Sequence, residues 1–251
     1  MKIATYNVNS VRTRLPNLLD WLGRAAPDVV CLQELKCQPD QFPEMEIRAA
    51  GYESAVVGQK SYNGVAILSK TPITLVSGTL GDEQARYIEV EIAGVRVVNI
   101  YAPNGNPVAS EKFPYKLDWL ARLEARMRTL LAEETPFVVC GDYNIIPEEI
   151  DAHDPAAWGG DALFQPQARA MYRRFLNLGL SDAFRIFEPR GGHYTFWDYQ
   201  AGAWARDNGI RIDYFLLSPQ LADRAVSCAI HRDERSREKA SDHVPVMLSL
   251  D

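Results

Sequence analysis

The feature that most constrains this chain is a short apolar run ending in a glycine and two polar side chains. Residues 137–140 are Phe, Val, Val and Cys; Gly141 follows, and then Asp142 and Asn144 stand two positions apart. A short apolar run bounded by a turn residue predicts a buried strand, although periodicity alone leaves a helix open. The two polar residues are either an ordinary turn or oxygen ligands for a hard cation such as Mg²⁺. Open α/β sheets hold their ligands at this carboxyl edge, which favours the second interpretation.

Similar polar tips recur along the chain, and this repetition favours a site over a series of unrelated turns. Strands are predicted over 2–8, 28–33, 95–101 and 210–218, and a last strand follows His243. The residues at these tips are Asn7 and Asn9, Glu34, Tyr101 and Asn104, Asp142 and Asn144, Asp213, and Asp242 with His243.

The remaining pattern mixes helical and strand periods. Helical spacing predicts a helix capped by Ser10, a long helix from Phe113 to Leu131, and a helix over 167–178. Alternation predicts paired strands over 52–57 and 64–69, a hairpin over 87–101, an aromatic strand over 193–199, and strands over 225–231 and 244–250. Residues 145–165 and 232–239 are predicted to be mostly loop. Antiparallel hairpins beside α/β crossovers fit two packed sheets with helices outside.

Length and composition bound the class of protein. The 251 residues contain no linker or low-complexity tract, so we expect a single domain over 1–251. No segment has the pattern of a signal peptide or a membrane span, and no cysteines have zinc or Cys-x-x-Cys spacing. We therefore expect a cytoplasmic protein. A net charge of −6 argues against indiscriminate, tight binding of polyanions. It is compatible with a nuclease, because bound metal and local basic patches can supply a positive field.

Asp213 predicts a second feature of the site. Its strand is apolar on both sides, and an unpaired buried carboxylate costs several kcal/mol. A histidine is a suitable partner, since the carboxylate can fix its tautomer and stabilise its protonated form. His243 adjoins another tip residue, Asp242, so we predict a hydrogen-bonded Asp213–His243 pair.

Taken together, the tip motifs resemble the exonuclease III group of the endonuclease/exonuclease/phosphatase superfamily over nearly the whole chain. The motifs that carry the resemblance are Tyr6-Asn7-Val8-Asn9, Leu32-Gln33-Glu34, Asn99 to Asn104, Gly141 to Asn144, Arg211 to Tyr214 and Ser241-Asp242-His243. The resemblance implies a four-layer α-β-β-α sandwich of two packed mixed sheets, like that of deoxyribonuclease I. It also implies hydrolysis of DNA phosphodiesters with Mg²⁺ or Mn²⁺, mainly at abasic sites and 3′ ends.

The resemblance also implies roles for the tip residues. Asn7, Glu34 and Asp242 correspond to the metal site, to which Asp142, Asn144 and His243 can add ligands, with Asn9 beside them. Asp142 corresponds to the base that activates water, and Asn144 faces the phosphate with it. Tyr101 would contact the scissile phosphate, supported by Asn104. His243, oriented by Asp213, would bind a phosphate oxygen or assist proton transfer.

The family's abasic-site pocket is aromatic and apolar. Phe196, Trp197, Ile210 and Ile212 correspond to it here, although simple core packing would equally explain the two aromatic residues. Ile210 stands where some relatives carry tryptophan, and Pro107 stands near an arginine of others. These departures leave open the balance between abasic cleavage and 3′-end trimming.

We therefore expect a DNA-repair phosphodiesterase that acts 5′ to abasic sites and on 3′ ends of double-stranded DNA. We expect a monomer with no organic cofactor and no membrane partner. The alternatives are a specialised 3′-exonuclease, a phosphodiesterase for inositol phosphates or sphingomyelin on the same fold, and a catalytically silent nucleic-acid-binding relative. The aromatic segment before Asp213 favours DNA, and retention of Glu34, Asp142, Asp213 and His243 argues against a silent relative.

Overall fold

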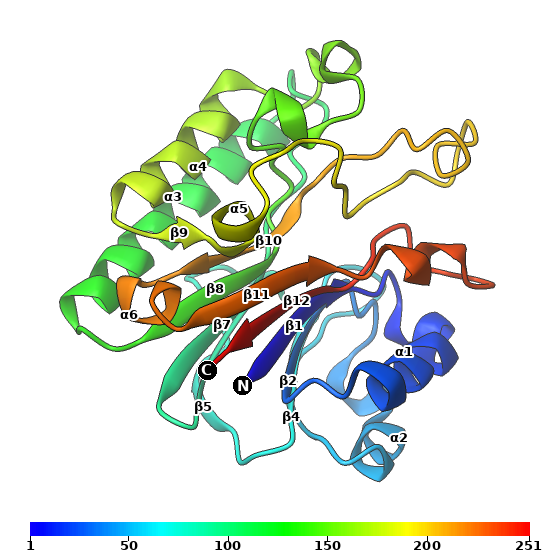
Figure 1. The fold of residues 1–251 in the computed structure, drawn as a ribbon, viewed down its shortest axis with the longest axis vertical. Helices are drawn as coiled ribbons and strands as arrows, with labels where there is room; N and C mark the ends of the chain where they lie inside the picture. The colour runs from blue at the N-terminus through cyan, green and yellow to red at the C-terminus, as the bar shows by residue number, and fades with distance from the viewer.

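The computed structural model describes residues 1–251 as two six-stranded sheets packed face to face, with helices outside (Figure 1). The first sheet has the order β11 (Ala225–Ile230), β12 (Val246–Leu250), β1 (Lys2–Asn7), β2 (Val29–Gln33), β4 (Val65–Ser69), β3 (Glu53–Val57). The second has the order β5 (Thr74–Ser77), β6 (Tyr87–Ile92), β7 (Val95–Tyr101), β8 (Phe137–Asp142), β10 (Asp213–Leu217), β9 (Ser181–Asp182). The pairs β1–β2 and β7–β8 are parallel and the others antiparallel, so both sheets are mixed.

Helices cover the two outer faces. The longer ones are α1 (Val11–Ala25) and α2 (Glu44–Ala49) beside the first sheet, and α3 (Lys112–Ala132) and α4 (Pro166–Asn177) beside the second (Figure 1). The short ones are α5 (Ala183–Phe187), α6 (Pro219–Ala222), η1 (Pro39–Gln41), η2 (Glu149–Asp151), η3 (Pro155–Trp158) and η4 (Arg232–Ser236). These layers confirm the predicted four-layer sandwich. None of the helices combines the length and apolar character needed to cross a bilayer.

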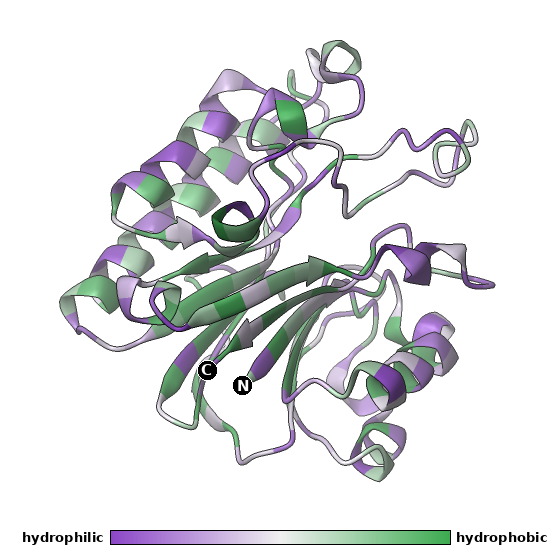
Figure 2. Ribbon diagram, viewed as in Figure 1, coloured by the Kyte–Doolittle hydropathy of each residue, from purple (hydrophilic) through white to green (hydrophobic).

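Three buried apolar clusters hold the layers together. One fills the space between the sheets, one lies between the second sheet and α3 with α4, and one lies between the first sheet and α1 with α2. Figure 2 shows the same division, with apolar residues concentrated on the strands and polar residues on the outer faces of the helices. Every residue of β2, β4 and β8 is buried, because these strands are covered on both faces. The predicted apolar runs are therefore central strands, and their ends open onto one edge of the sandwich.

Four local predictions are wrong. The segment 232–239, predicted to be mostly loop, contains the 3₁₀ helix η4. Ser10 does not cap α1: its backbone has a φ of +86°, and its hydroxyl lies 2.9 Å from that of Thr13. Residues 193–199 form no strand and make only isolated bridges from Phe196 to Ile210 and to His243. The strand predicted from residue 210 begins at Asp213. The aromatic alternation instead reflects a loop that buries its own side chains in a small separate cluster.

Candidate active site

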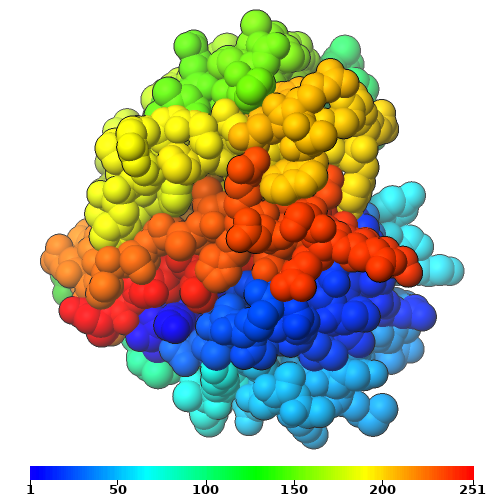
Figure 3. Space-filling model, turned by 45° about the vertical axis from the view of Figure 1, so that its right-hand side comes forward, coloured from blue at the N-terminus to red at the C-terminus, as the bar shows by residue number.

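The strand registers bring the polar tips together at one edge of the sandwich. In the second sheet Asp142 lies opposite both Tyr101 and Asp213, on its two neighbouring strands. In the first sheet β1 and β2 run in parallel, so Asn7 and the residue after Gln33 reach the same edge. Figure 3 shows that segments from the beginning and the end of the chain lie side by side on one face of the molecule.

A cavity of about 320 Å³ opens at this edge, and we call it the active-site cavity. Its lining includes most of the predicted tip residues: Glu34, Tyr101, Asn104, Asp142, Asn144, Asp242 and His243. The other lining residues are Trp158, Asp161, Leu163, Phe196, Asp198 and Ile212. A larger depression of about 610 Å³ near β3 and α2 is shallow and open, and it contains no comparable group of metal-ligating side chains.

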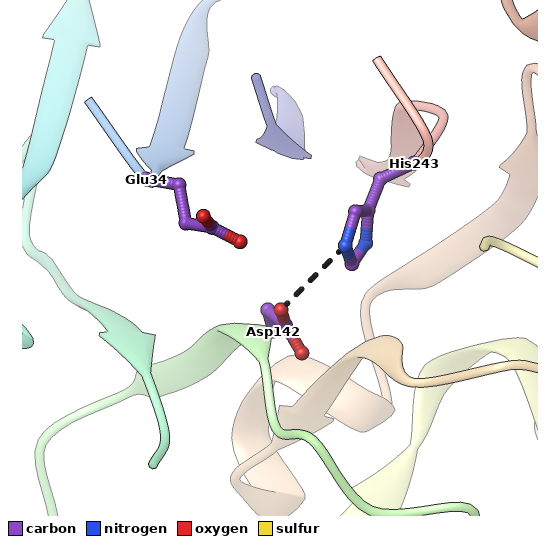
Figure 4. A group of neighbouring side chains, drawn as sticks. All are labelled: Glu34, Asp142 and His243. Carbon is purple, nitrogen blue, oxygen red and sulfur yellow. Dashed lines mark ion pairs between the residues drawn. The ribbon is translucent and has the colours of Figure 1, made fainter. Parts of the chain in front are cut away.

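Glu34, Asp142 and His243 form the tightest group of charged side chains in the cavity. One ligand atom from each lies within 4.8 Å of the others, and the three side chains point toward a common centre (Figure 4). The amide nitrogen of Asn7 donates to Glu34 Oε1 at 2.9 Å and to Asp142 Oδ2 at 3.0 Å. Two carboxylates held this close without an intervening cation repel each other, and their oxygens are the donors that Mg²⁺ and Mn²⁺ prefer. The residues present therefore fit a divalent metal.

The predicted Asp213–His243 pair is confirmed. His243 Nδ1 lies 2.9 Å from Asp213 Oδ2, which also accepts a 2.7 Å hydrogen bond from the Thr195 hydroxyl. Burial opposes protonation of the imidazole, but the adjacent Asp213 carboxylate outweighs it and raises the pKa of His243 to about 10. The other ring nitrogen, Nε2, lies 3.8 Å from Asp142 Oδ2. His243 is thus a buried cation that bridges two carboxylates and faces the cavity.

Asp142 is the most perturbed acid of the cavity. Burial, and then repulsion from Asp213, raises the pKa of Asp142 to about 7. Its Oδ1 accepts a 2.8 Å hydrogen bond from the backbone N–H of Asn144. A carboxylate with a raised pKa is a stronger base than an exposed one, and it can still be ionised near neutral pH.

A second set of polar residues surrounds Glu34. Lys36 Nζ lies 3.0 Å from Glu34 Oε2 and donates to Asn9 Oδ1 at 2.5 Å, while the Asn9 amide donates to Asp242 Oδ1 at 2.9 Å. Burial would raise the pKa of Glu34, but the Lys36 ammonium and the Asn7 amide lower it, so this carboxylate stays ionised. Asp242 lines the cavity but lies outside the tight group of three.

Tyr101, Asn104 and Asn144 form the wall beside Asp142. Burial, and then the nearby Glu34 charge, raises the pKa of Tyr101 well above its usual range, so its hydroxyl remains a donor. The Asn104 amide donates to Asn144 Oδ1 at 3.2 Å, and the Asn144 amide donates to the carbonyl of Ala102 at 2.9 Å. Asn144, Glu34 and Asn9 all have positive φ, between +43° and +52°, a conformation that non-glycine residues adopt at some cost.

The apolar wall differs from the predicted one. Phe196 and Ile212 line the cavity, and the Phe196 ring packs edge-on against the His243 ring at 4.9 Å. Trp197 and Ile210 do not line it: Trp197 is fully buried and donates its indole N–H to Asp207, and Ile210 is buried beneath the wall. The tight loop explains the difference, because Trp197 packs on the backbone of Gly209, where a Cβ would lie 2.6 Å from its indole nitrogen.

Three residues of the loop over 145–165 line the cavity but were not predicted from the sequence. Trp158, Asp161 and Leu163 line the cavity together with Glu34, Asp142 and His243. The loop is held by Asp161, whose Oδ1 accepts from the Asn106 amide at 3.0 Å and from the Leu163 backbone at 2.8 Å. A half-buried tryptophan in a loop otherwise rich in Pro, Asp and Gly was the available signal.

Lys116 was also missed, because it stands on the apolar side of the long helix. It is fully buried beneath the cavity, and burial lowers its pKa to about 7. Nothing in its spacing distinguishes it from a surface lysine of α3.

Comparisons with known proteins agree with this geometry. Residues 4–243 match the Endonuclease/Exonuclease/phosphatase family. An exodeoxyribonuclease of Bacillus subtilis is 34% identical, with 100% of this chain and 99% of the relative covered. The solved AP endonuclease of Archaeoglobus fulgidus is 40% identical with a TM-score of 0.96, covering 100% of this chain and 99% of that one. The Neisseria 3′ phosphatase NExo, solved with a product DNA hairpin, is 37% identical with a TM-score of 0.97 and the same coverage. This chain therefore belongs to the endonuclease/exonuclease/phosphatase family.

Proposed function

We propose that this protein is a metal-dependent DNA-repair phosphodiesterase that cuts 5′ to abasic sites and processes blocked 3′ ends. The observation that carries the proposal is the active-site cavity, where a metal-ligating group faces an apolar wall. The names of the relatives, which include exodeoxyribonuclease III, DNA repair nuclease and AP endonuclease, support DNA as the substrate.

Glu34 would hold Mg²⁺ or Mn²⁺, with Asn7 and Asp242 next to it. Asp142 then stays free to act as a base, and the protonated His243 faces the phosphate. When bound, the ion would act as a Lewis acid that neutralises charge on the phosphate. Asn7 would keep the two carboxylates at the right separation, because its amide donates to both. The chain's own residues must still orient the phosphate and move the protons.

In the proposed reaction Asp142 accepts a proton from water as the water oxygen forms a bond to phosphorus. The bond from phosphorus to the 3′ oxygen breaks, and that oxygen takes up a proton from solvent to leave a 3′-hydroxyl. His243, kept protonated by Asp213, would stabilise negative charge on a phosphate oxygen. Tyr101, Asn104 and Asn144 would supply further fixed donors, which act without reorganisation in the transition state.

The apolar wall would provide selectivity for the abasic site. An abasic sugar has no base to unstack, whereas an extruded normal nucleotide gives up pairing and stacking worth a few kcal/mol. Phe196, Ile212, Leu163 and Trp158 would pack against the bare sugar next to the scissile phosphate. Selectivity would then come from both the cost of extrusion and the fit.

A second candidate is an enzyme specialised for 3′ ends, with little abasic-site activity. The likeness to NExo, which is named a 3′ phosphatase, favours this candidate as strongly as the Archaeoglobus enzyme favours the first. Both would use the same metal-ligating group, so only the substrate preference separates them.

We further propose that the protein acts as a cytoplasmic monomer. All four cysteines are free and buried, as is usual in reducing compartments. The exposed large apolar residues, such as Met45, Leu75 and Val226, lie on different elements.

The test compares initial rates on three matched duplexes, one with a single abasic analogue, one with a 3′-phosphate and one undamaged, at fixed salt and Mg²⁺. We expect the abasic duplex to be cut fastest and all activity to stop in excess chelator. Glu34→Gln should be inactive but folded, since it removes one charged ligand. Equal rates on abasic and undamaged duplexes would exclude the proposed selectivity, and activity confined to 3′ ends would favour the second candidate.

A further inference from the structure

Lys116 lies beneath the active-site cavity with its ammonium enclosed by backbone carbonyls. Its Nζ donates to the carbonyl of Asn104 at 3.0 Å and to the carbonyl of Asn144, and it lies 3.5 Å from the carbonyl of Ala162. An ammonium has three N–H donors, so the three carbonyls satisfy it. They belong to three separate segments: the turn after β7, the turn after β8, and the loop over 145–165.

Stability alone gives little reason to place a lysine there. Lys116 forms no salt bridge and is attracted by Asp142 and Asp161 only at longer range, and a buried charge without a direct ionic partner costs several kcal/mol. An apolar side chain of similar length would fill the same space without that cost. The fold instead accommodates the lysine: a Cβ at Gly105 would lie only 2.7 Å from Lys116 Cδ.

Each segment tied to the ammonium presents a side chain to the cavity. The first carries Asn104, the second carries Asn144, and the third carries Leu163 next to Ala162. Asn144 also holds a backbone φ of +49°, a conformation that persists only when the surroundings enforce it. The hydrogen bond to its carbonyl is one of the contacts that do so.

We infer that Lys116 is a positioning residue: its buried ammonium ties together the three segments that hold the phosphate donors and the sugar wall of the cavity. This inference rests on the proposed function, because it assumes that Asn104 and Asn144 bind the scissile phosphate. It does not require Lys116 to touch the substrate, and α3 keeps it out of reach of solvent.

The test uses two variants of Lys116 and one matched control in the same helix. Lys116→Met keeps the length but removes all three donors, whereas Lys116→Gln keeps two N–H donors without the charge. Leu130→Ala creates a cavity at the other end of α3, in the same buried cluster and far from the carbonyls. For each we would measure kcat and KM on the abasic duplex, thermal stability, and Mn²⁺ binding.

We expect Lys116→Met to lower kcat by about 10²-fold, the scale of a 1 Å misplacement of reacting groups. Mn²⁺ binding should change much less, since Glu34 lies on another segment. Lys116→Gln should regain part of kcat because it restores donors to the carbonyls. Leu130→Ala should lose stability yet keep wild-type kcat per folded molecule.

A wild-type kcat in Lys116→Met, or losses no larger than in Leu130→Ala at equal stability, would overturn the inference. If Lys116→Met does not fold, Lys116→Gln provides the test. A folded Lys116→Gln protein with wild-type kcat would also overturn the inference. Asn144→Ala separates this result from the proposed function itself. An active Asn144→Ala would reject the assigned site, while an inactive Asn144→Ala beside fully active Lys116 variants would reject only the positioning role.

Discussion

The carboxylate of Asp213 is buried, and the protonated His243 beside it stabilises its negative charge. It is buried in β10, accepts from Thr195 and His243 through one oxygen, and has no partner for the other oxygen. Replacing it by asparagine leaves His243 without the charge that keeps it protonated. We expect Asp213→Asn to lower kcat by about 10²- to 10³-fold, the scale of losing one preorganised donor.

The same pair can be tested with a double-mutant cycle. If Asp213 acts through His243, the double variant Asp213→Asn/His243→Gln should be no slower than His243→Gln alone. Additive losses in kcat would mean that the two side chains act independently.

Trp158 is expected to determine how tightly the abasic duplex is held. It lines the cavity with Phe196 and Leu163, and Trp158→Ala would remove its aromatic face from the cavity wall. We expect this change to raise KM for the abasic duplex about tenfold, and to affect the 3′-phosphate duplex less, because apolar contact is worth roughly 1–3 kcal/mol. Trp158→Phe, which keeps an aromatic face, should stay near wild type. Equal effects on both duplexes would contradict a role in sugar recognition.

For single residues, the sequence predicted a pairing where burying an unpaired charge costs free energy. It did not predict the position of a side chain that depends on how neighbouring loops pack. Because burying an unpaired carboxylate costs several kcal/mol, the sequence predicted that Asp213 pairs with His243, and this pair is confirmed. Trp197 was expected in the wall from the family resemblance, with core packing as the alternative, and packing against Gly209 places it in the core. Lys116 gave no signal, because the carbonyls that surround it come from loops whose path no local pattern encodes.

One hydrogen bond between α1 and the rest of the molecule involves a histidine that can be protonated. The indole N–H of Trp21, on the buried face of α1, donates to His231 Nδ1 at 2.9 Å, so His231 must be neutral with its proton on Nε2. Burial lowers the pKa of His231 below its usual 6.5, while Glu234 opposes and Arg24 assists this shift. The folded state therefore favours the neutral imidazole.

The sign of the pH effect follows from this shift. The unfolded chain takes up its proton first as pH falls through 6.5, so the contact's contribution is full above that pH and declines below it, until the folded-state pKa is reached. We expect His231→Asn, which keeps an acceptor for Trp21 but does not titrate, to lose less thermal stability between about pH 7.5 and about pH 5.5. The measurement is the midpoint of thermal unfolding of both proteins across that range. Parallel curves would show that His231 does not contribute.

Helices and strands whose apolar residues repeat at a regular spacing could be predicted from the sequence. Segments whose conformation depends on contacts with distant parts of the chain could not. The pair β3–β4 and the hairpin β6–β7 match the alternation in the sequence. The segment 193–199 alternates equally well but joins no sheet, and the strand that follows it, β10, is already paired with β8 and β9. The two-residue strand β9 is too short for any pattern to reveal.

The whole molecule is expected to unfold as one unit, consistent with a single domain over 1–251. The two sheets share one buried apolar cluster, so neither can keep its inner face covered without the other. Tryptophan fluorescence and far-ultraviolet circular dichroism should therefore give coincident transitions in urea. Two separated midpoints would instead indicate that the halves of the sandwich are independent. The layers themselves were predictable because they follow from the alternation of strand and helix periods along the chain.

The place of β1 in its sheet has a consequence for biosynthesis. β1 lies between β2 and β12, and these two neighbours come from opposite ends of the sequence. A chain emerging from the ribosome can pair β1 with β2 early, but it must wait for β12 before the other edge is covered. Glu34 and His243 are separated in the same way, so a nascent or prematurely terminated chain cannot bring Glu34, Asp142 and His243 together. The active-site cavity of this nuclease is therefore assembled only when its synthesis is almost finished.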